Sequence, residues 1–119
     1  MSNFPMPGSP VRGSKTGKPI MALFDLLGRN WSMGVLWILC TVGPLTFRGL
    51  QDQCEGISPT VLNMRLKEMR QADFITHTSD GYVVTAMGLE LFAFLEPLGY
   101  WSLEWAEHLE KLNKELKEA

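Results

Sequence analysis

The spacing of apolar side chains along the first half of the chain predicts short helices separated by polar, glycine-containing turns. Three helices are expected before residue 55, over residues 19–27, 31–41 and 47–54. Gly28 ends the first of them and Gly43-Pro44 breaks the second. Asn30 and Thr46 are the predicted N-caps of the second and third, because a short polar side chain can accept a hydrogen bond from a free backbone N–H.

The clearest helix start in the chain lies at Ser58-Pro59. Serine suits the N-cap, and proline suits the first helical position because its missing N–H would have no partner there. The helix is predicted to continue to Ala72. Two short β-prone runs follow, residues 74–78 and 82–85, and they flank Ser79-Asp80-Gly81, whose composition is typical of a hairpin turn.

From Ala86 onward the pattern is helical again. Apolar residues recur here at steps of three or four, at Leu91, Leu95, Leu98, Trp101, Trp105, Leu109, Leu112 and Leu116. Pro97 is expected to kink this helix or split it in two. With a short strand at Leu45, the order of elements is that of a winged helix. The predicted fold class is mainly α (α+β): a winged helix-turn-helix with a small β-hairpin wing and a long C-terminal dimerisation helix.

Chain length and composition indicate one domain with an extended start. A chain of 119 residues with 45% hydrophobic content suits a single core. Residues 1–18 combine Pro, Gly and Ser with three bases, which predicts a disordered basic arm. The three bases are Arg12, Lys15 and Lys18. Residues 19–95 are expected to form the winged helix-turn-helix, and residues 96–119 the dimerisation helix of the same domain.

Hydropathy and cysteine usage favour a cytoplasmic protein with no membrane partner. The longest mainly apolar stretch, residues 33–42, is shorter than the ~20 residues of a transmembrane helix. The N-terminal segment lacks the apolar core of a secretory signal. Cys40 and Cys54 each stand alone, so neither a disulfide framework nor a CxxC motif is indicated. Both are predicted to be buried thiols, and Cys54, near a helix end, is expected to be the more exposed; whether it has a redox role stays open.

Residues 46–72 have the form of a helix-turn-helix motif, in which a glycine-containing turn at residues 55–58 joins two helices. At about 100° per residue, the second helix buries one face. That face consists of Leu62, Leu66 and Met69. The opposite face carries Thr60, Asn63, Met64 and Lys67. This is the face that a DNA major groove would meet.

The side chains of this second helix suit contact with double-stranded DNA. Asn63 can pair with an adenine edge, and Thr60 and Met64 can touch thymine methyl groups. The helix N-terminus with Ser58 offers N–H groups to a phosphate. Basic residues that can neutralise phosphates are Arg65, Lys67 and Arg70, with Arg48 in the preceding helix. The alternative interpretation is an ordinary solvated surface helix, because short motif matches are often false.

The charge distribution works against strong binding to nucleic acid. Net charge is −2, and residues 96–119 hold six Glu against three Lys. The rest of the chain holds eight basic and seven acidic residues. Phosphate contacts supply much of the affinity for DNA, so a moderate and strongly salt-dependent affinity is expected.

The sequence resembles the HxlR-type winged helix-turn-helix regulators, which are relatives of the MarR type. The matching segments are KPIMALFDLLGRNW at 18–31, GPLTF at 43–47, GISPTVLNMRLKEMRQADFI at 56–75 and TAMGLELF at 85–92. The resemblance implies a homodimeric transcription regulator.

The chain departs from this family at three places. Members that sense oxidants generally carry a cysteine just before the proline of the first helix, where this chain has Lys18. A basic pair that is frequent in the first helix of the motif is replaced by Gln51 and Asp52. The short wing also carries no Arg or Lys.

The apolar stripe of the C-terminal helix is expected to pack against a second copy of the chain, because large exposed apolar patches are avoided. The first helix is expected to form part of the same interface. The predicted interface residues are Ile20, Leu23, Phe24, Leu98, Trp101, Trp105, Leu109 and Leu112. Two-fold symmetry would place the recognition helices ~34 Å apart, which predicts a pseudo-palindromic operator.

Two classes of function remain in competition. The first is a dimeric DNA-binding transcriptional regulator, and the second is a winged-helix module for protein interaction that has weak or lost DNA binding. A small-molecule effector stays open, since its pocket would leave no sequence signature. No enzyme, cofactor or metal is expected: no nucleophile is paired with a base, and His77 and His108 lack further ligands at zinc spacing.

Overall fold

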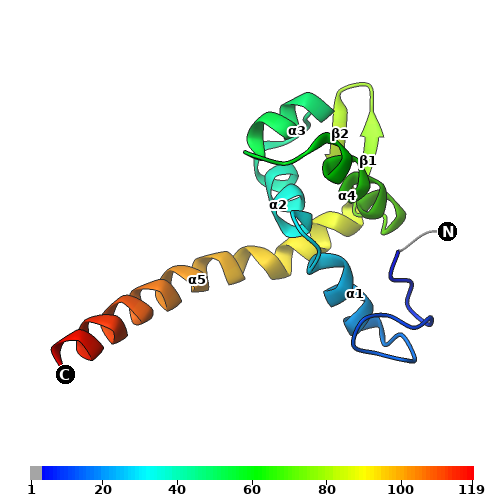
Figure 1. The fold of residues 1–119 in the computed structure, drawn as a ribbon. Coiled ribbons are helices and arrows are strands. Elements are labelled where there is room, and N and C mark those ends of the chain that lie inside the picture. The colour runs from blue at the N-terminus through cyan, green and yellow to red at the C-terminus, as the bar shows by residue number, and fades with distance from the viewer. Residues whose placement is uncertain (1–3) are drawn as a thin grey trace. The chain divides into compact units, whose positions relative to one another are not determined.

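The computed structural model describes residues 4–119 and divides into two compact units, one that ends at Leu89 and one from Glu90 to Ala119 (Figure 1). The helices and strands are α1 (Pro19–Leu27), α2 (Ser32–Val42), α3 (Phe47–Gln53), α4 (Pro59–Gln71), β1 (Ile75–Thr78), β2 (Gly81–Val84) and α5 (Ala86–Glu118). The order predicted from the sequence is confirmed, and the fold of the first unit is a winged helix-turn-helix. The boundary between the units falls inside α5.

Helix α2 begins differently from the sequence expectation. Its N-cap is Trp31, which adopts a left-handed backbone conformation with φ 72°, and not Asn30. The carbonyl oxygen of Asn30 instead accepts a hydrogen bond of 2.7 Å from Nε of Arg65, which belongs to α4. A contact between distant segments therefore fixes this turn, and a local capping pattern could not reveal it.

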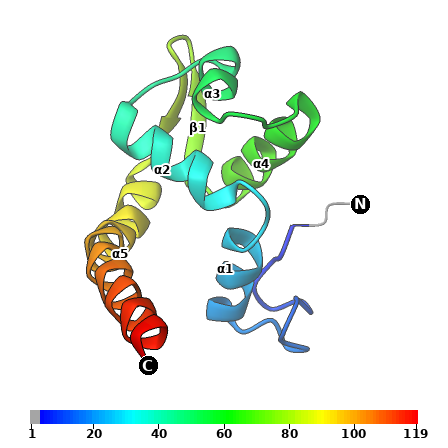
Figure 2. The ribbon, with the colours of Figure 1, turned by 60° about the vertical axis from the view of Figure 1, so that its left-hand side comes forward.

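The core of the first unit surrounds α2, which packs against α1, α3, α4 and β2 (Figure 2). The interior is almost entirely aliphatic. Its fully buried side chains include Val35, Leu36, Leu50, Leu62, Leu66, Met69 and Ile75. Burial of this set is the main favourable term that holds the helix-turn-helix together.

The wing is a two-stranded antiparallel hairpin in which Ile75 pairs with Val84 and Thr78 with Gly81. The predicted strand at Leu45 is a single β-bridge to Tyr82, with N···O distances of 3.2 and 2.7 Å. Gly81 has φ 114°, and a Cβ there would lie 2.5 Å from the carbonyl oxygen of Leu45. The residue must therefore be glycine for the wing to approach the segment before α3.

Thr85 joins the end of the wing to the start of α5. Its hydroxyl donates to the carbonyl oxygen of Asp73 at 2.5 Å and accepts from the N–H of Gly88 at 3.1 Å. The N–H of Thr85 donates to the carbonyl oxygen of Phe74 at 3.0 Å. The first turn of α5 is thereby attached to the segment that leaves α4.

Residues 4–18, expected from their composition to be disordered, form a chain of turns in the structure; residues 1–3 of that predicted arm lie outside the described residues. The N–H of Gly8 donates to the carbonyl oxygen of Gly17 at 2.9 Å, and Val11 and Ser14 form an isolated bridge. Pro5 and Gly17 are buried. The segment therefore has local backbone hydrogen bonds that its composition did not indicate.

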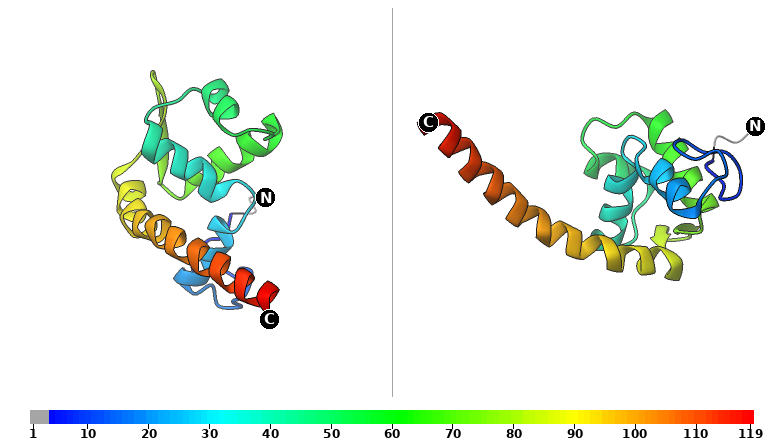
Figure 3. Two further views of the ribbon diagram at one scale, coloured as in Figure 1. Left: turned by 90° about the vertical axis from the view of Figure 1, so that its left-hand side faces the viewer. Right: turned by 90° about the horizontal axis from the view of Figure 1, so that it is seen from below.

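Helix α5 continues through Pro97 without being split (Figure 3). Proline removes one N–H from the helix, so the carbonyl oxygen of Ala93 loses its donor. The turns before and after it keep the helical conformation. Within residues 4–119, no helix is long and apolar enough to cross a membrane.

Candidate nucleic-acid interface

Two capped helices form the helix-turn-helix. The hydroxyl of Thr46 accepts a hydrogen bond from the N–H of Gly49 at 3.0 Å at the start of α3, as predicted. The hydroxyl of Ser58 accepts from the N–H of Val61 at 3.2 Å at the start of α4, also as predicted. Between them, Gly56 turns the chain with φ 90° and Ile57 enters the core. The second helix is therefore fixed at its first turn.

Helix α4 separates its side chains as its sequence predicts. Leu62, Leu66 and Met69 are at most 1% exposed. The opposite face is exposed to solvent and carries Thr60, Asn63, Met64 and Lys67. The four side chains expected to meet a major groove therefore lie together on one accessible surface, which we call the α4 outer face.

Arg65 does not join the α4 outer face, in contrast to the sequence expectation that it neutralises phosphate. Its side chain is 12% exposed and pairs with Glu68 one turn later. Its Nε donates to the carbonyl oxygen of Asn30. The guanidinium is thus engaged inside the protein, and Arg65 serves the fold.

Glu68 is the buried partner of Arg65, and the sequence pattern did not reveal it. The residue is 8% exposed, and its second carboxylate oxygen lies 2.7 Å from Nη1 of Arg29 in the turn after α1. The spacing of Arg65 and Glu68 on one helix could have suggested an ion pair. Arg29 is distant in sequence, and nothing local points to it. The three side chains attach α4 to the turn between α1 and α2.

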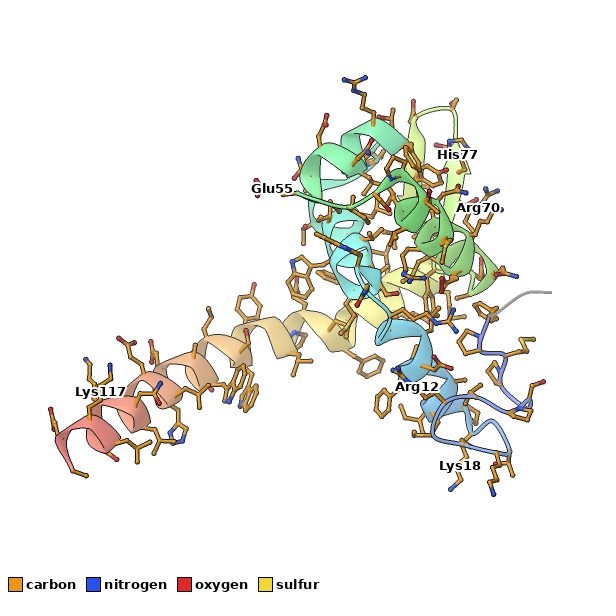
Figure 4. All side chains as sticks on the ribbon, viewed as in Figure 1. Arg12, Lys18, Glu55, Arg70, His77 and Lys117 are labelled. Carbon is orange, nitrogen blue, oxygen red and sulfur yellow. The ribbon has the colours of Figure 1, made fainter. Side chains whose placement is uncertain are left out.

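Positive charge on the exposed side of the motif comes from a few residues. Lys67 and Arg70 are exposed on α4, whose one carboxylate, Glu68, is buried, and Arg48 is exposed on α3. Arg70 lies on the same side as His77 of the wing, whereas Glu55 lies at the opposite end of α4 (Figure 4). The positive part of the surface is thus the C-terminal half of α4.

The wing offers polar and aromatic groups without cationic side chains. His77 stacks on Tyr82 across the hairpin, with ring centroids 4.4 Å apart and an interplanar angle of 24°. Thr76 and Thr78 are exposed on β1. Such a wing can form hydrogen bonds to a sugar-phosphate backbone but adds little charge.

The residues predicted to form a dimer interface lie mostly on the surface. On α1, Ile20 is 52% exposed and Phe24 is 56% exposed, while Leu23 is half-buried. The unit from Glu90 to Ala119 is a single helix, so nothing within it covers its apolar side chains. They are exposed at Leu98, Trp101, Trp105, Leu109 and Leu112, and the rings of Trp101 and Trp105 stack with centroids 6.3 Å apart.

The cysteines lie differently from the sequence expectation. Cys54, predicted to be the more exposed, is 2% exposed because the chain turns inward after α3, whereas Cys40 is only half-buried. Burial raises the pKa of Cys40 to about 11 and also raises the pKa of Cys54. Both thiols are therefore protonated at neutral pH. Among residues 4–119, no group of three or more His, Cys, Asp or Glu side chains could hold a metal ion.

Solved structures of known regulators share this fold. The quinone-bound YodB of B. subtilis is 27% identical, with a TM-score of 0.66 over 72% of this chain and 97% of that chain. The reduced form of the same regulator gives a TM-score of 0.62 over 71% and 89% of the two chains, also at 27% identity. A possible HxlR family transcriptional factor from Thermoplasma volcanium GSS1 is 25% identical, with a TM-score of 0.64 over 72% and 84%.

Sequence comparison identifies the family directly. Among proteins with curated functions, none matches the chain. The HxlR-like helix-turn-helix family matches residues 26–110, which run from the end of α1 through the motif and the wing into α5. The structural neighbours that share this fold include transcriptional regulators. The chain therefore belongs to the HxlR-like helix-turn-helix family of transcriptional regulators.

Proposed function

We propose that this regulator acts in the cytoplasm as a homodimer and binds a pseudo-palindromic operator through the α4 outer face. The observation that carries the proposal is a capped helix whose accessible surface holds Thr60, Asn63, Met64 and Lys67 together. An amide can make a bidentate contact with adenine, and a methyl or thioether group can pack on the thymine methyl. Base contacts from one helix face are what a sequence-specific reader needs.

Phosphate contacts would come from few cations in this proposal. Lys67, Arg70 and Arg48 are exposed around the motif, while Arg65 is engaged with Glu68. The exposed carboxylates of Asp52 and Glu55 lie at the end of α3 and in the turn. Binding would release few counterions from the DNA, so the affinity for DNA is moderate. Removal of any one of these cations should therefore lower the affinity measurably.

The test is a binding titration on DNA from upstream of the chain's own gene, at several salt concentrations. Asn63→Ala is expected to cost about 1–3 kcal/mol on the preferred sequence and to relax the preference at one base pair. Lys67→Ala is expected to weaken binding to all sequences and to reduce the salt slope by about 1. Arg65→Ala should not change that slope if the protein stays folded.

Lys114→Ala, an exposed lysine of α5, is the matched control and should bind like the wild type. Equal affinity and equal salt slope for wild type, Asn63→Ala and Lys67→Ala would refute the assignment of DNA binding to the α4 outer face.

The dimer is supported by the apolar stripe of α5, which has no covering element in its own unit. Trp105→Asp is expected to convert the dimer to a monomer in sedimentation, because it places a charge within an apolar interface. Glu107→Lys, on the opposite side of the helix, should leave the mass unchanged. A monomeric wild type, or a Trp105→Asp variant that still sediments as a dimer, would contradict this interface.

The second candidate is a winged-helix module that binds protein and has lost DNA binding. The wing without Lys or Arg and the net charge of −2 favour it. A dimer without salt-dependent affinity for any DNA sequence would select this candidate over the regulator that reads DNA.

Thiol chemistry is not expected to control the protein. A raised pKa keeps a thiol protonated, and for Cys40, with a pKa of about 11, the reactive thiolate at pH 8 is about a hundredfold scarcer than for an ordinary thiol. Labelling by a chromogenic disulfide should therefore be slow at pH 8 and accelerate toward pH 11. Unfolded protein in denaturant provides the control. Fast labelling of the folded chain, or loss of DNA binding after diamide, would contradict this expectation.

A further inference from the structure

A cavity in the first unit lies beside α1, apart from the α4 outer face. Its volume is about 320 Å³, which is within the range of small-molecule sites. Three parts of the chain build it: residues 4–7, helix α1, and the end of α4 together with Phe74. All of them precede Leu89 and so belong to one compact unit.

The lining selects an uncharged ligand. Buried Ala22 and Leu26, which are 2% and 3% exposed, are part of the wall, and the rings of Phe4 and Phe74 also line it. Gln71 is the one polar side chain among the described lining residues, and none of these is charged. A charged molecule would lose hydration here without gaining a partner. We propose that this cavity binds a neutral, flat aromatic molecule of roughly two rings.

The wall opposite α1 is held in place by backbone hydrogen bonds. The N–H of Met6 donates to the carbonyl oxygen of Phe4 at 2.9 Å, and the N–H of Ser9 donates to that of Met6 at 3.1 Å. Gly8 is joined to Gly17, just before α1. Pro5 is buried between these turns. The cavity is therefore formed before a ligand enters, which lowers the entropic cost of binding.

The position of the cavity gives a bound molecule access to two functional elements. Gln71 and Ala72 end α4, whose outer face is proposed to read DNA. Leu23 lines the cavity from α1, and its neighbours Ile20 and Phe24 are exposed on the proposed dimer surface. A ligand that fits one arrangement of α1 and α4 better than another shifts DNA affinity. This regulatory step rests on the proposed function, whereas ligand binding does not.

The experiment uses N-phenyl-1-naphthylamine, a neutral fluorescent aromatic probe, with the full chain labelled at its methionine methyl groups for NMR. Saturable binding of one probe per chain is expected, with a shift of the methyl signal of Met6, which lines the cavity. Ala72→Leu fills part of the space and should weaken binding about tenfold or more. Phe4→Ala removes one aromatic wall from a surface segment and should also weaken it.

Ala106→Leu, an exposed position of α5, adds the same side chain outside the cavity and should leave probe affinity unchanged. Equal affinity in the wild type, Ala72→Leu and Phe4→Ala, or binding that leaves the Met6 signal unmoved, would overturn the site. If the probe binds but saturating probe leaves operator affinity unchanged, the regulatory step is refuted and the site stands. Absence of DNA binding without probe counts against the proposed function and not against the cavity.

Discussion

Gly88→Ala is expected to lower the free energy of unfolding of the first unit by about 3 kcal/mol or more. A Cβ at this position would lie 2.2 Å from the carbonyl oxygen of Phe74 and 2.8 Å from Cγ1 of Val84. The nearest atom belongs to backbone, which cannot rotate away as a side chain does. If the start of α5 moved away from Phe74 to make room, the hydrogen bond from the N–H of Gly88 to the hydroxyl of Thr85 would break. This bond caps the first turn of α5. Urea denaturation followed by circular dichroism measures the loss.

Gly34→Ala is the matched control for this substitution. Gly34 is also helical, in α2, but a Cβ there meets nothing within 4 Å. Alanine is the better helix former, so this variant should gain about 0.5–1 kcal/mol. Both variants must be compared at one protein concentration, because the proposed dimer would contribute to apparent stability. Similar stabilities for the two variants would show that α5 does not begin against Phe74.

Glu68→Ala is expected to cost about 3 kcal/mol, because Arg65 loses its carboxylate partner and Arg29 loses the shorter of its ion pairs, keeping Asp25 at 3.6 Å. The side chains of Arg29 and Arg65 are 20% and 12% exposed, so water can compensate only part of the loss. The expected cost therefore lies at the lower end of the range for breaking a buried ion pair. Thermal and urea unfolding both measure this loss of stability. The largest loss is expected at the amides where α1, α2 and α4 meet.

Glu55→Ala removes an exposed carboxylate from the turn before α4 and should change stability by no more than about 0.5 kcal/mol. A loss for Glu68→Ala as small as this would contradict a stabilising role for the ion pairs of Glu68 with Arg29 and Arg65. In the Glu68→Ala variant, Arg65 no longer has its carboxylate partner and becomes available to phosphate. The salt slope of DNA binding should therefore increase, whereas a loss of stability alone would not increase it.

Most helices and strands could be predicted because their signals lie within a few residues of each other in the sequence. Thr46 and Ser58 cap the helices of the motif as expected, because the donor that each satisfies lies three residues away. The burial of Leu62, Leu66 and Met69 followed from helical periodicity. These features depend on short-range geometry, which the sequence contains in full.

Features that depend on distant segments could not be predicted in this way. Asn30 fits a capping pattern, yet its carbonyl serves Arg65 from another helix, and Trp31 takes the cap position. Arg65, expected to contact phosphate, is paired instead with Glu68, which also binds Arg29 from a distant segment. Burial of Cys54 likewise depends on where the chain turns after α3.

The bridge between Leu45 and Tyr82 has a consequence for the order of folding. It closes a long loop of chain that contains both helices of the motif and most of the wing. Closing such a loop has an entropic cost that local helix formation does not have, so these two hydrogen bonds are expected to form late. The start of α3 and the wing then become native in the same event. A chain that has just emerged from synthesis would acquire its helices first, and the contact between the wing and the segment before α3 only when residue 82 returns to residue 45.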